Sequence, residues 1–324
     1  RKITQYTRYG TVLLSVVQSL GIAVYLERMT LNESFRIVEN PGLAFKFMTV
    51  MTLTTGTAFI MWLGEQITER GIGNGMSLLI FAGIVVGFPR GMLDTVQMIQ
   101  RGDLSLLATL FLLAMMVLVV AAIVFVERGQ RRITVQYAKR VVGRRMTSGG
   151  STYIPLKVNQ AGVIPIIFAS SVLYFPTLLG SVIQWPPFQR FLDNHLVNQA
   201  SPVYIAIYGL LVVFFAYFYT AISFNPVDTA DNIRKYGGFI PGIRPGKPTA
   251  DHLDHILSRI TLPGSLFLAT IALIPSIALI VMGINPNIFP FGGTSVLIVV
   301  GVALETMKQI ESQLTMRHYE GFLR

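Results

Sequence analysis

The residues of this chain that come closest to a nucleotide site lie in the stretch GIRPGKPT at 242–249. A P-loop needs a glycine five residues before Gly246, where this chain has Pro241, and it needs a strand-to-helix setting. A loop with three prolines does not supply that setting, so we reject nucleotide binding. The prolines restrict φ while the glycines permit tight turning, and the pattern therefore predicts a stiff, exposed turn with Arg244 at its tip.

Two histidines have the spacing of metal ligands. His252 and His255 stand at i and i+3 beside Asp251 and Asp254, which would place them on one helical face. Nothing nearby completes a site, and acidic residues are typical of the first turn of a solvated helix. The chain has no cysteine, no Gly-x-Ser-x-Gly elbow and no His-Glu-x-x-His pair. We therefore expect no catalytic residue, no metal site, no cofactor and no enzymatic activity.

The stretch 127–157 carries dense positive charge. Its basic residues include Arg131, Arg132, Lys139, Arg140, Arg144 and Arg145. Taken alone, such a charge is explained by the orientation of a membrane protein, whose cytoplasmic loops are rich in Lys and Arg.

The elements that must position these residues are membrane helices. Of the 324 residues, 52% are hydrophobic and only 13% are charged, with a mean hydropathy of +0.58, whereas soluble domains carry about 25% charged residues. A spanning helix needs about 20 mostly apolar residues. Eight such stretches occur, at 10–26, 43–64, 76–88, 104–126, 158–183, 203–224, 260–282 and 290–304. We predict an all-α, polytopic transmembrane helix bundle. Pro89 ends the third apolar run, although the helix could resume toward Gln100 with a kink.

Lys and Arg concentrate in alternate loops of this arrangement. The positive-inside rule then places both termini of the chain, and the two large basic loops 127–157 and 225–259, in the cytoplasm. The interiors of the predicted spans lack ionisable residues, which ion-coupled transporters use for coupling. A small-solute secondary transporter stays an alternative, because it also predicts broken helices in a bundle.

Seven segments carry a resemblance to a known family. They are RKITQYTRYG at 1–10, GEQITERGIGNG at 64–75, ERGQRRI at 127–133, QYAKR at 136–140, PLKVNQAGVIPIIFASS at 155–171, FNPVDTADNIRKYGGFIPGIRPGKPT at 224–249 and FGGTS at 291–295. In this order the chain resembles the SecY family of bacterial Sec translocon subunits. The resemblance implies helices three to ten of a ten-helix fold, without the first two helices and the plug. It divides the chain into 1–103, the remainder of an N-terminal half, and 104–324, a C-terminal half.

The resemblance implies a protein-conducting channel of the bacterial cytoplasmic membrane, which translocates unfolded secretory polypeptides and inserts membrane proteins. The residues that match the family's apolar pore ring are Met76, Ile80, Ile167 and Leu297. Met76 and Ile80 are one helical turn apart, as a ring or a packed core requires. The lateral gate carries over to Gln18, Asn159 and Pro165. Pro165 and Pro176 should break the helix at 158–183.

The implied partners are the SecE and SecG subunits, the SecA motor ATPase, the ribosome, signal sequences, nascent polypeptides and membrane lipid. Docking of SecA and the ribosome is expected at Arg131, Arg132, Lys139, Arg140 and Arg244. Glu65, Glu69 and Arg70 are expected to contact SecE, although helix capping and snorkelling explain them equally well. A docking fragment that conducts nothing is a further alternative, because two helices of the family fold have no counterpart.

Overall fold

The computed structural model describes all of the chain except residues 1, 29, 33–34, 37, 103, 138–139, 143–144, 148–149, 183–184, 284–291 and 323–324. The long helices are α1 (Lys2–Arg28), α2 (Leu43–Arg70), α3 (Gly75–Arg101), α4 (Leu106–Arg128), α5 (Ile164–Val182), α7 (Pro202–Ser223), α9 (Lys247–Val281) and α10 (Gly293–Phe322). The short helical segments are α6 (Pro186–Leu192), η1 (Asp193–Val197) and α8 (Pro226–Lys235). The strands are β1 (Thr30–Asn32), β2 (Phe35–Arg36), β3 (Gln130–Tyr137), β4 (Arg140–Val142), β5 (Arg145–Thr147), β6 (Ser151–Lys157) and β7 (Gly238–Phe239).

The helical architecture confirms the predicted transmembrane bundle. Within the described ranges, seven helices are long and apolar enough to cross a membrane. A shorter apolar helix, Ile164–Thr177, corresponds to the fifth predicted span. The chain is therefore a multi-pass membrane protein.

The third predicted span continues beyond Pro89 toward Gln100, which is the alternative that the sequence left open. Helix α3 runs without interruption from Gly75 to Arg101, with Pro89 inside it. A proline removes only one helical hydrogen bond, and the strong helical tendency of both flanks outweighs that loss here. The second half of α3 consequently carries Arg90 and Asp94, so the predicted lack of charge applies only to its first half.

The fifth and seventh predicted spans differ from the observed helices in where they begin. Helix α5 starts at Ile164 and not at 158, which places Pro165 in its first turn. A proline in the first turn costs no hydrogen bond, so only Pro176 lies in the helix interior and Pro165 does not break the helix. Helix α9 begins at Lys247, well before the predicted 260, with Pro248 in its first turn.

The chain contains two compact units. The first comprises Arg1–Arg90, Ser170–Tyr204 and Glu305–Arg324, and the second comprises Gly91–Ala169 and Ile205–Leu304. The two units are interleaved along the sequence and do not follow a single boundary near residue 103. The family-based division into 1–103 and 104–324 stays a prediction.

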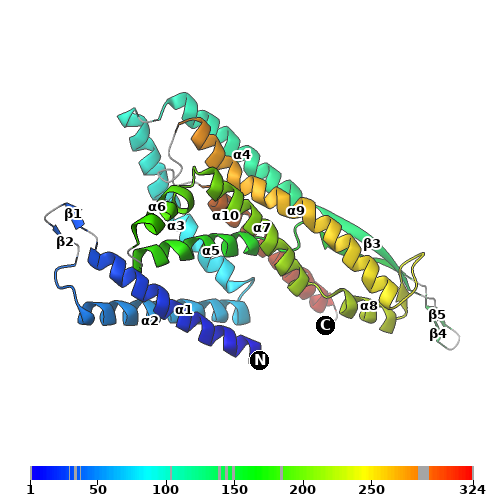
Figure 1. The fold of residues 1–324 in the computed structure, drawn as a ribbon. Helices are drawn as coiled ribbons and strands as arrows, with labels where there is room; N and C mark the ends of the chain where they lie inside the picture. The colour runs from blue at the N-terminus through cyan, green and yellow to red at the C-terminus, as the bar shows by residue number, and fades with distance from the viewer. Residues whose placement is uncertain are drawn as a thin grey trace. The chain divides into compact units, whose positions relative to one another are not determined.

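In the first unit, α1 and α2 contact each other as an antiparallel pair (Figure 1). The buried face of α1 consists of small residues one turn apart, Ser15, Ser19 and Ala23. The Ser19 hydroxyl donates to the Ser15 carbonyl oxygen at 2.6 Å, so its polar group is satisfied within the helix. Small side chains allow close helix approach in a bilayer, where packing and not water drives association.

In the second unit, α9 is longer than a membrane is thick. Its 35 residues span about 52 Å at about 1.5 Å per residue, against about 30 Å of hydrocarbon. The excess lies at the N-terminal end of α9, where Figure 1 shows β3 and α8 beside it. The sequence predicted this region as loops, apart from a solvated helix start around His252 and His255, which α9 confirms. It instead contains an antiparallel sheet of order β6-β3-β7, whose core forms against α8 and α9.

Candidate functional site

The turn that carries Arg244 is built as a rigid tip. Gly242 and Gly246 adopt positive φ angles of 83° and 99°, which glycine permits without strain. The Ile243 amide donates to the Ile240 carbonyl oxygen at 3.0 Å, and the Thr249 hydroxyl donates to the Arg244 carbonyl oxygen at 2.9 Å. The Arg244 side chain is exposed. The predicted exposed tip is confirmed, and Thr249 is a support that the sequence analysis missed.

Strand β7 ties this tip to the basic hairpin. Residues Gln136 and Tyr137 of β3 pair with Phe239 and Gly238 of β7, immediately before the tip. Gly238 is buried, and a Cβ there would lie 2.9 to 3.0 Å from side-chain atoms of three neighbours. The two cytoplasmic segments predicted from charge therefore share one backbone sheet.

A common apolar core holds the same assembly together. Its buried members are Ile133, Val135, Leu156, Ile233, Ile240 and Leu253, from β3, β6, α8, the tip and α9. Leu253 and Leu156 are fully buried. Each such side chain stabilises the fold by about 1.5–3 kcal/mol when removed from water. We call the assembly of β3, β6, β7, α8, the tip and the first turns of α9 the docking head.

The predicted basic residues have different places on the docking head. Arg131 and Arg132 lie on β3 with exposed side chains, and the Arg132 guanidinium carbon lies 4.8 Å from the centre of the Tyr153 ring on β6. The backbone of Arg140 lies in β4, whereas the position of its side chain and the whole of Lys139 fall outside the described residues. The contact with the Tyr153 ring holds this exposed guanidinium at the surface of the sheet.

Asn159 lies in the connection between β6 and α5, not within a helix. Its side-chain nitrogen donates to a carboxylate oxygen of Glu127, at the end of α4, and to the Gly162 carbonyl oxygen at 3.0 Å. Asn159 is 5% exposed. Its amide therefore joins the end of α4 to the approach of α5 within the second unit, and its role at a lateral gate stays a prediction.

The four predicted ring residues divide between the units. Met76 and Ile80 lie one turn apart on α3 in the first unit, and Ile167 on α5 and Leu297 on α10 belong to the second. Leu297 is fully buried, Ile80 and Ile167 are half-buried, and Met76 is 43% exposed. A Cβ at Gly64 of α2 would overlap the Met76 sulfur, so Met76 packs closely on α2. Their assembly into one ring stays a prediction.

Two ion pairs connect α1 with α2. The Arg8 Nε lies 2.7 Å from a Glu65 carboxylate oxygen, and the Lys46 Nζ lies 3.1 Å from a Glu27 carboxylate oxygen. Arg8, Glu65 and Met76 line a groove of about 420 Å³ in the first unit. Of the residues assigned to SecE, Glu65 is thus paired within the chain, while Glu69 and Arg70 are exposed. Gln18 is half-buried on α1.

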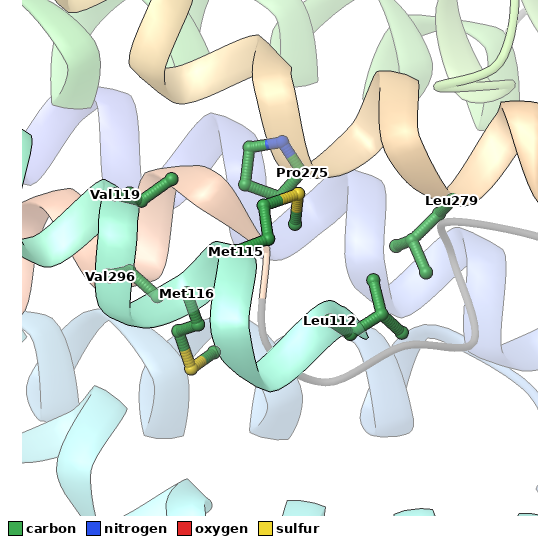
Figure 2. A pocket seen from close by; sticks show the side chains of 7 residues that line it. All are labelled: Leu112, Met115, Met116, Val119, Pro275, Leu279 and Val296. Atoms are coloured by element: carbon green, nitrogen blue, oxygen red, sulfur yellow. The ribbon is translucent and has the colours of Figure 1, made fainter. Parts of the chain in front are cut away.

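The second unit contains a small apolar cavity (Figure 2). It measures about 10 Å³ and is lined by Leu112, Met115, Met116, Val119, Pro275, Leu279 and Val296. A water in such a cavity would need two to four polar partners, and the lining side chains offer none. Nearby, Gly293 at the start of α10 fits closely against Pro275, where a Cβ would lie 2.5 Å from the Ala272 carbonyl oxygen. The cavity is therefore a small packing gap beside Pro275 and not a ligand site.

Metal chemistry finds no support in the part of the chain that the structure describes. No group of three or more His, Asp or Glu side chains gathers there with the geometry of a metal site. His252 is half-buried and His255 exposed on the first turns of α9, within the docking head.

Comparison with known proteins gives a consistent result. The SecY family matches residues 1–307. The protein translocase subunit SecY of Streptomyces scabiei is 53% identical over 333 residues, which cover 100% of this chain and 75% of that protein. The corresponding subunit of Mycobacterium leprae is 50% identical over 335 residues, with the same coverage.

Solved structures show the same fold. A SecY structure that addresses how the plug domain stabilizes the closed translocation channel has a TM-score of 0.65 at 16% identity, covering 93% of this chain and 71% of that one. Sec61 in a canine ribosome-channel complex from the endoplasmic reticulum has a TM-score of 0.58 at 15% identity, covering 93% of this chain and 70% of that one. At these identities the likeness concerns the fold alone.

Proposed function

Because the chain belongs to the SecY family, we propose that its docking head receives the partner that drives polypeptides through a membrane channel. As a member of this family the chain is a subunit of a protein-conducting channel, and a small-solute transporter is not favoured. The observation that carries the docking proposal is the Arg244 tip. It is exposed, held by the Thr249 hydroxyl, and attached through β7 to the basic strand β3.

The charge of the docking head suits two partners. The side chains of Arg131, Arg132 and Arg244 are exposed on the docking head, and guanidinium groups form paired hydrogen bonds with carboxylates and phosphates. A protein cleft with acidic residues suits the single projecting Arg244, as a motor ATPase of the SecA kind would use. Ribosomal RNA suits the basic strand, and binding to it should weaken steeply with salt.

In this proposal the channel wall comes from the apolar helices. Met76, Ile80, Ile167 and Leu297 seal a closed pore against water, because apolar constrictions exclude water and ions without binding a passing polypeptide. Gln18 and Asn159 border the seam through which apolar segments leave for the lipid. SecE contacts the chain near Glu69 and Arg70, SecG lies at the periphery, and both described ends of the chain face the cytoplasm.

The test is import of a secretory preprotein into vesicles that carry the protein with SecE and SecG, supplied with SecA and ATP. Arg244→Glu should lower the import rate about tenfold or more, because it reverses the charge of the contacting group. Lys247→Glu is the matched control, since Lys247 is exposed only three residues away and the change in net charge is identical. Equal rates for the two variants would remove Arg244 from the coupling.

A further inference from the structure

The segment between α5 and α7 folds into a short helix that lies against the end of α5. Helices α6 and η1 continue without a break from Pro186 to Val197 (Figure 1). Leu192 is buried, and a Cβ at Gly180 of α5 would overlap its Cδ1 atom. The Gln189 side-chain nitrogen donates to the Gly180 carbonyl oxygen at 3.2 Å. All of these residues belong to the first unit.

The outer side of this segment is apolar and aromatic. Trp185 is 62% exposed, Phe191 is 50% exposed, and both Pro186 and Pro187 are exposed. Pro187 and Phe191 stand at i and i+4, which places them on the same helical face. Exposed charges accompany them at Arg190 and Asp193. An aromatic surface with charges beside it is typical of helices that lie in the plane of a membrane interface.

The chain path places the segment at the membrane surface. Helix α5 is an apolar helix that ends at Val182, and α7 begins its own apolar run at Pro202. The chain leaves one span at Val182 and enters the next at Pro202, and the contacts of Leu192 and Gln189 with Gly180 keep the segment close to the end of the first span, where lipid meets water. Tryptophan is enriched at that boundary, because its ring is apolar and its N–H is polar.

We propose that α6 and η1 form an interfacial anchor, in which Trp185 and Phe191 insert between the headgroups and the upper acyl chains of the phospholipids. The anchor fixes the end of α5 through the Gly180–Leu192 contact and the Gln189 hydrogen bond. A second consequence of this anchor rests on the proposed function. When α5 moves during sideways opening of the channel, the lipid interface holds its Val182 end, so the displacement is largest at its Ile164 end.

The tryptophan content of the chain makes a direct test possible. The chain has two tryptophans, Trp62 and Trp185, so Trp62→Phe leaves Trp185 as the single fluorophore. The variant is measured in the assembled complex in vesicles whose acyl chains carry bromine either near the headgroup or near the methyl end. Shallow bromine should quench Trp185 about twofold more strongly than deep bromine, because tryptophan prefers the interfacial depth.

Three outcomes overturn the proposal. Quenching of Trp185 by iodide in the aqueous phase but not by bromolipid would place the residue in water. Protection from both quenchers would mean that another protein covers it, and equal or stronger quenching by deep bromine would place it inside the hydrocarbon. The quenching of Trp185 fluorescence does not depend on transport, so a failure of the anchor proposal is distinguishable from a failure of the docking proposal.

A second variant tests the anchor itself in the Trp62→Phe background. Phe191→Ser should reduce shallow quenching of Trp185 about twofold, because the helix loses its second inserted ring. Asn194→Ser is the matched control, since Asn194 is an exposed polar residue of the same segment and its replacement should leave the quenching unchanged. Preprotein import into the same vesicles tests whether the anchor affects the movement of α5. A change in import with Phe191→Ser and none with Asn194→Ser supports this effect. Equal import rates for the two variants refute it.

Discussion

Arg8 on α1 and Glu65 on α2 form an ion pair whose Nε–Oε1 distance is 2.7 Å, and a second pair closes the other end of the same two helices. From Arg8 to Glu27 and from Lys46 to Glu65 the separation along each helix is the same, nineteen residues. At about 1.5 Å per residue this is about 28 Å, close to the thickness of the hydrocarbon core. The two pairs therefore lie about one hydrocarbon thickness apart along the helices and fix the register of α1 against α2.

Charge exchange tests this register. Arg8→Glu should destabilise the α1–α2 pair, and the double variant Arg8→Glu with Glu65→Arg should restore it, because the attraction is regained with reversed polarity. Arg8 is nearly half exposed, so the coupling energy should be only about 0.2–1 kcal/mol. Thermal unfolding of the four proteins of the cycle in lipid nanodiscs measures it. Additive effects of the two single changes would show that the pair is not coupled.

The spans were predictable from the sequence because a long apolar run in a membrane has few alternatives to a helix. The strands were not predicted, because their backbone hydrogen bonds join segments that lie apart in the sequence. Ile133 and Val135 alternate with exposed residues, which is the period-2 signal of a strand, but two buried positions are too few to distinguish a strand from a polar loop. The exposed Arg244 was predictable from local prolines and glycines. The Thr249 hydrogen bond and the β7 pairing were not, because both depend on residues that meet only in the folded docking head.

The Thr249 hydroxyl should matter for coupling through Arg244. Thr249→Val keeps the shape of this buried side chain but removes the donor to the Arg244 carbonyl oxygen, at a cost of about 1 kcal/mol. We expect ATP-dependent import to fall by a few-fold while the complex stays assembled. Thr249→Ser is the control, because it retains the hydroxyl. A rate for Thr249→Val equal to that of Thr249→Ser would exclude the hydrogen bond as a support of the tip.

Replacement of Ile80 by serine should raise the ion conductance of the closed channel. A hydroxyl offers water a hydrogen-bonding partner in a constriction that seals by excluding water. Ile80 is a cleaner probe than Met76, because Met76 also packs on Gly64. The measurement is ion leak from vesicles in the absence of a translocating polypeptide. Val86→Ser on the same helix, where Val86 is 78% exposed, should not leak, and equal leak from both variants would argue against the ring.

Gly264 of α9 should not tolerate a side chain. A Cβ there would overlap the carbonyl oxygen of Val158, a backbone atom that cannot rotate away. Gly264→Ala should lower the stability by about 1–3 kcal/mol, as overpacking of a close contact does. Gly209→Ala is the control, because its Cβ would lie at an ordinary 3.6 Å from Leu273 Cδ1. Thermal unfolding in detergent compares the two, and similar midpoints would mean that α9 shifts to make room.

The lateral-gate hypothesis is best tested at Gln18. Asn159→Leu would also break the hydrogen bond to Glu127 and leave a half-buried carboxylate without that donor, so its effect would mix stability with gating. Gln18→Leu on α1 avoids this complication.

Interhelical polar contacts in membranes are worth about 0.6–2 kcal/mol, which corresponds to about a 3- to 30-fold shift in a gate equilibrium. We therefore expect Gln18→Leu to change the import ratio between preproteins with strong and weak signal sequences. The control is Leu20→Ile, an apolar exchange at an exposed position of the same helix, which should leave that ratio constant. The same ratio in the Gln18→Leu variant and in the unmodified protein would show that Gln18 does not contribute to signal-sequence selection.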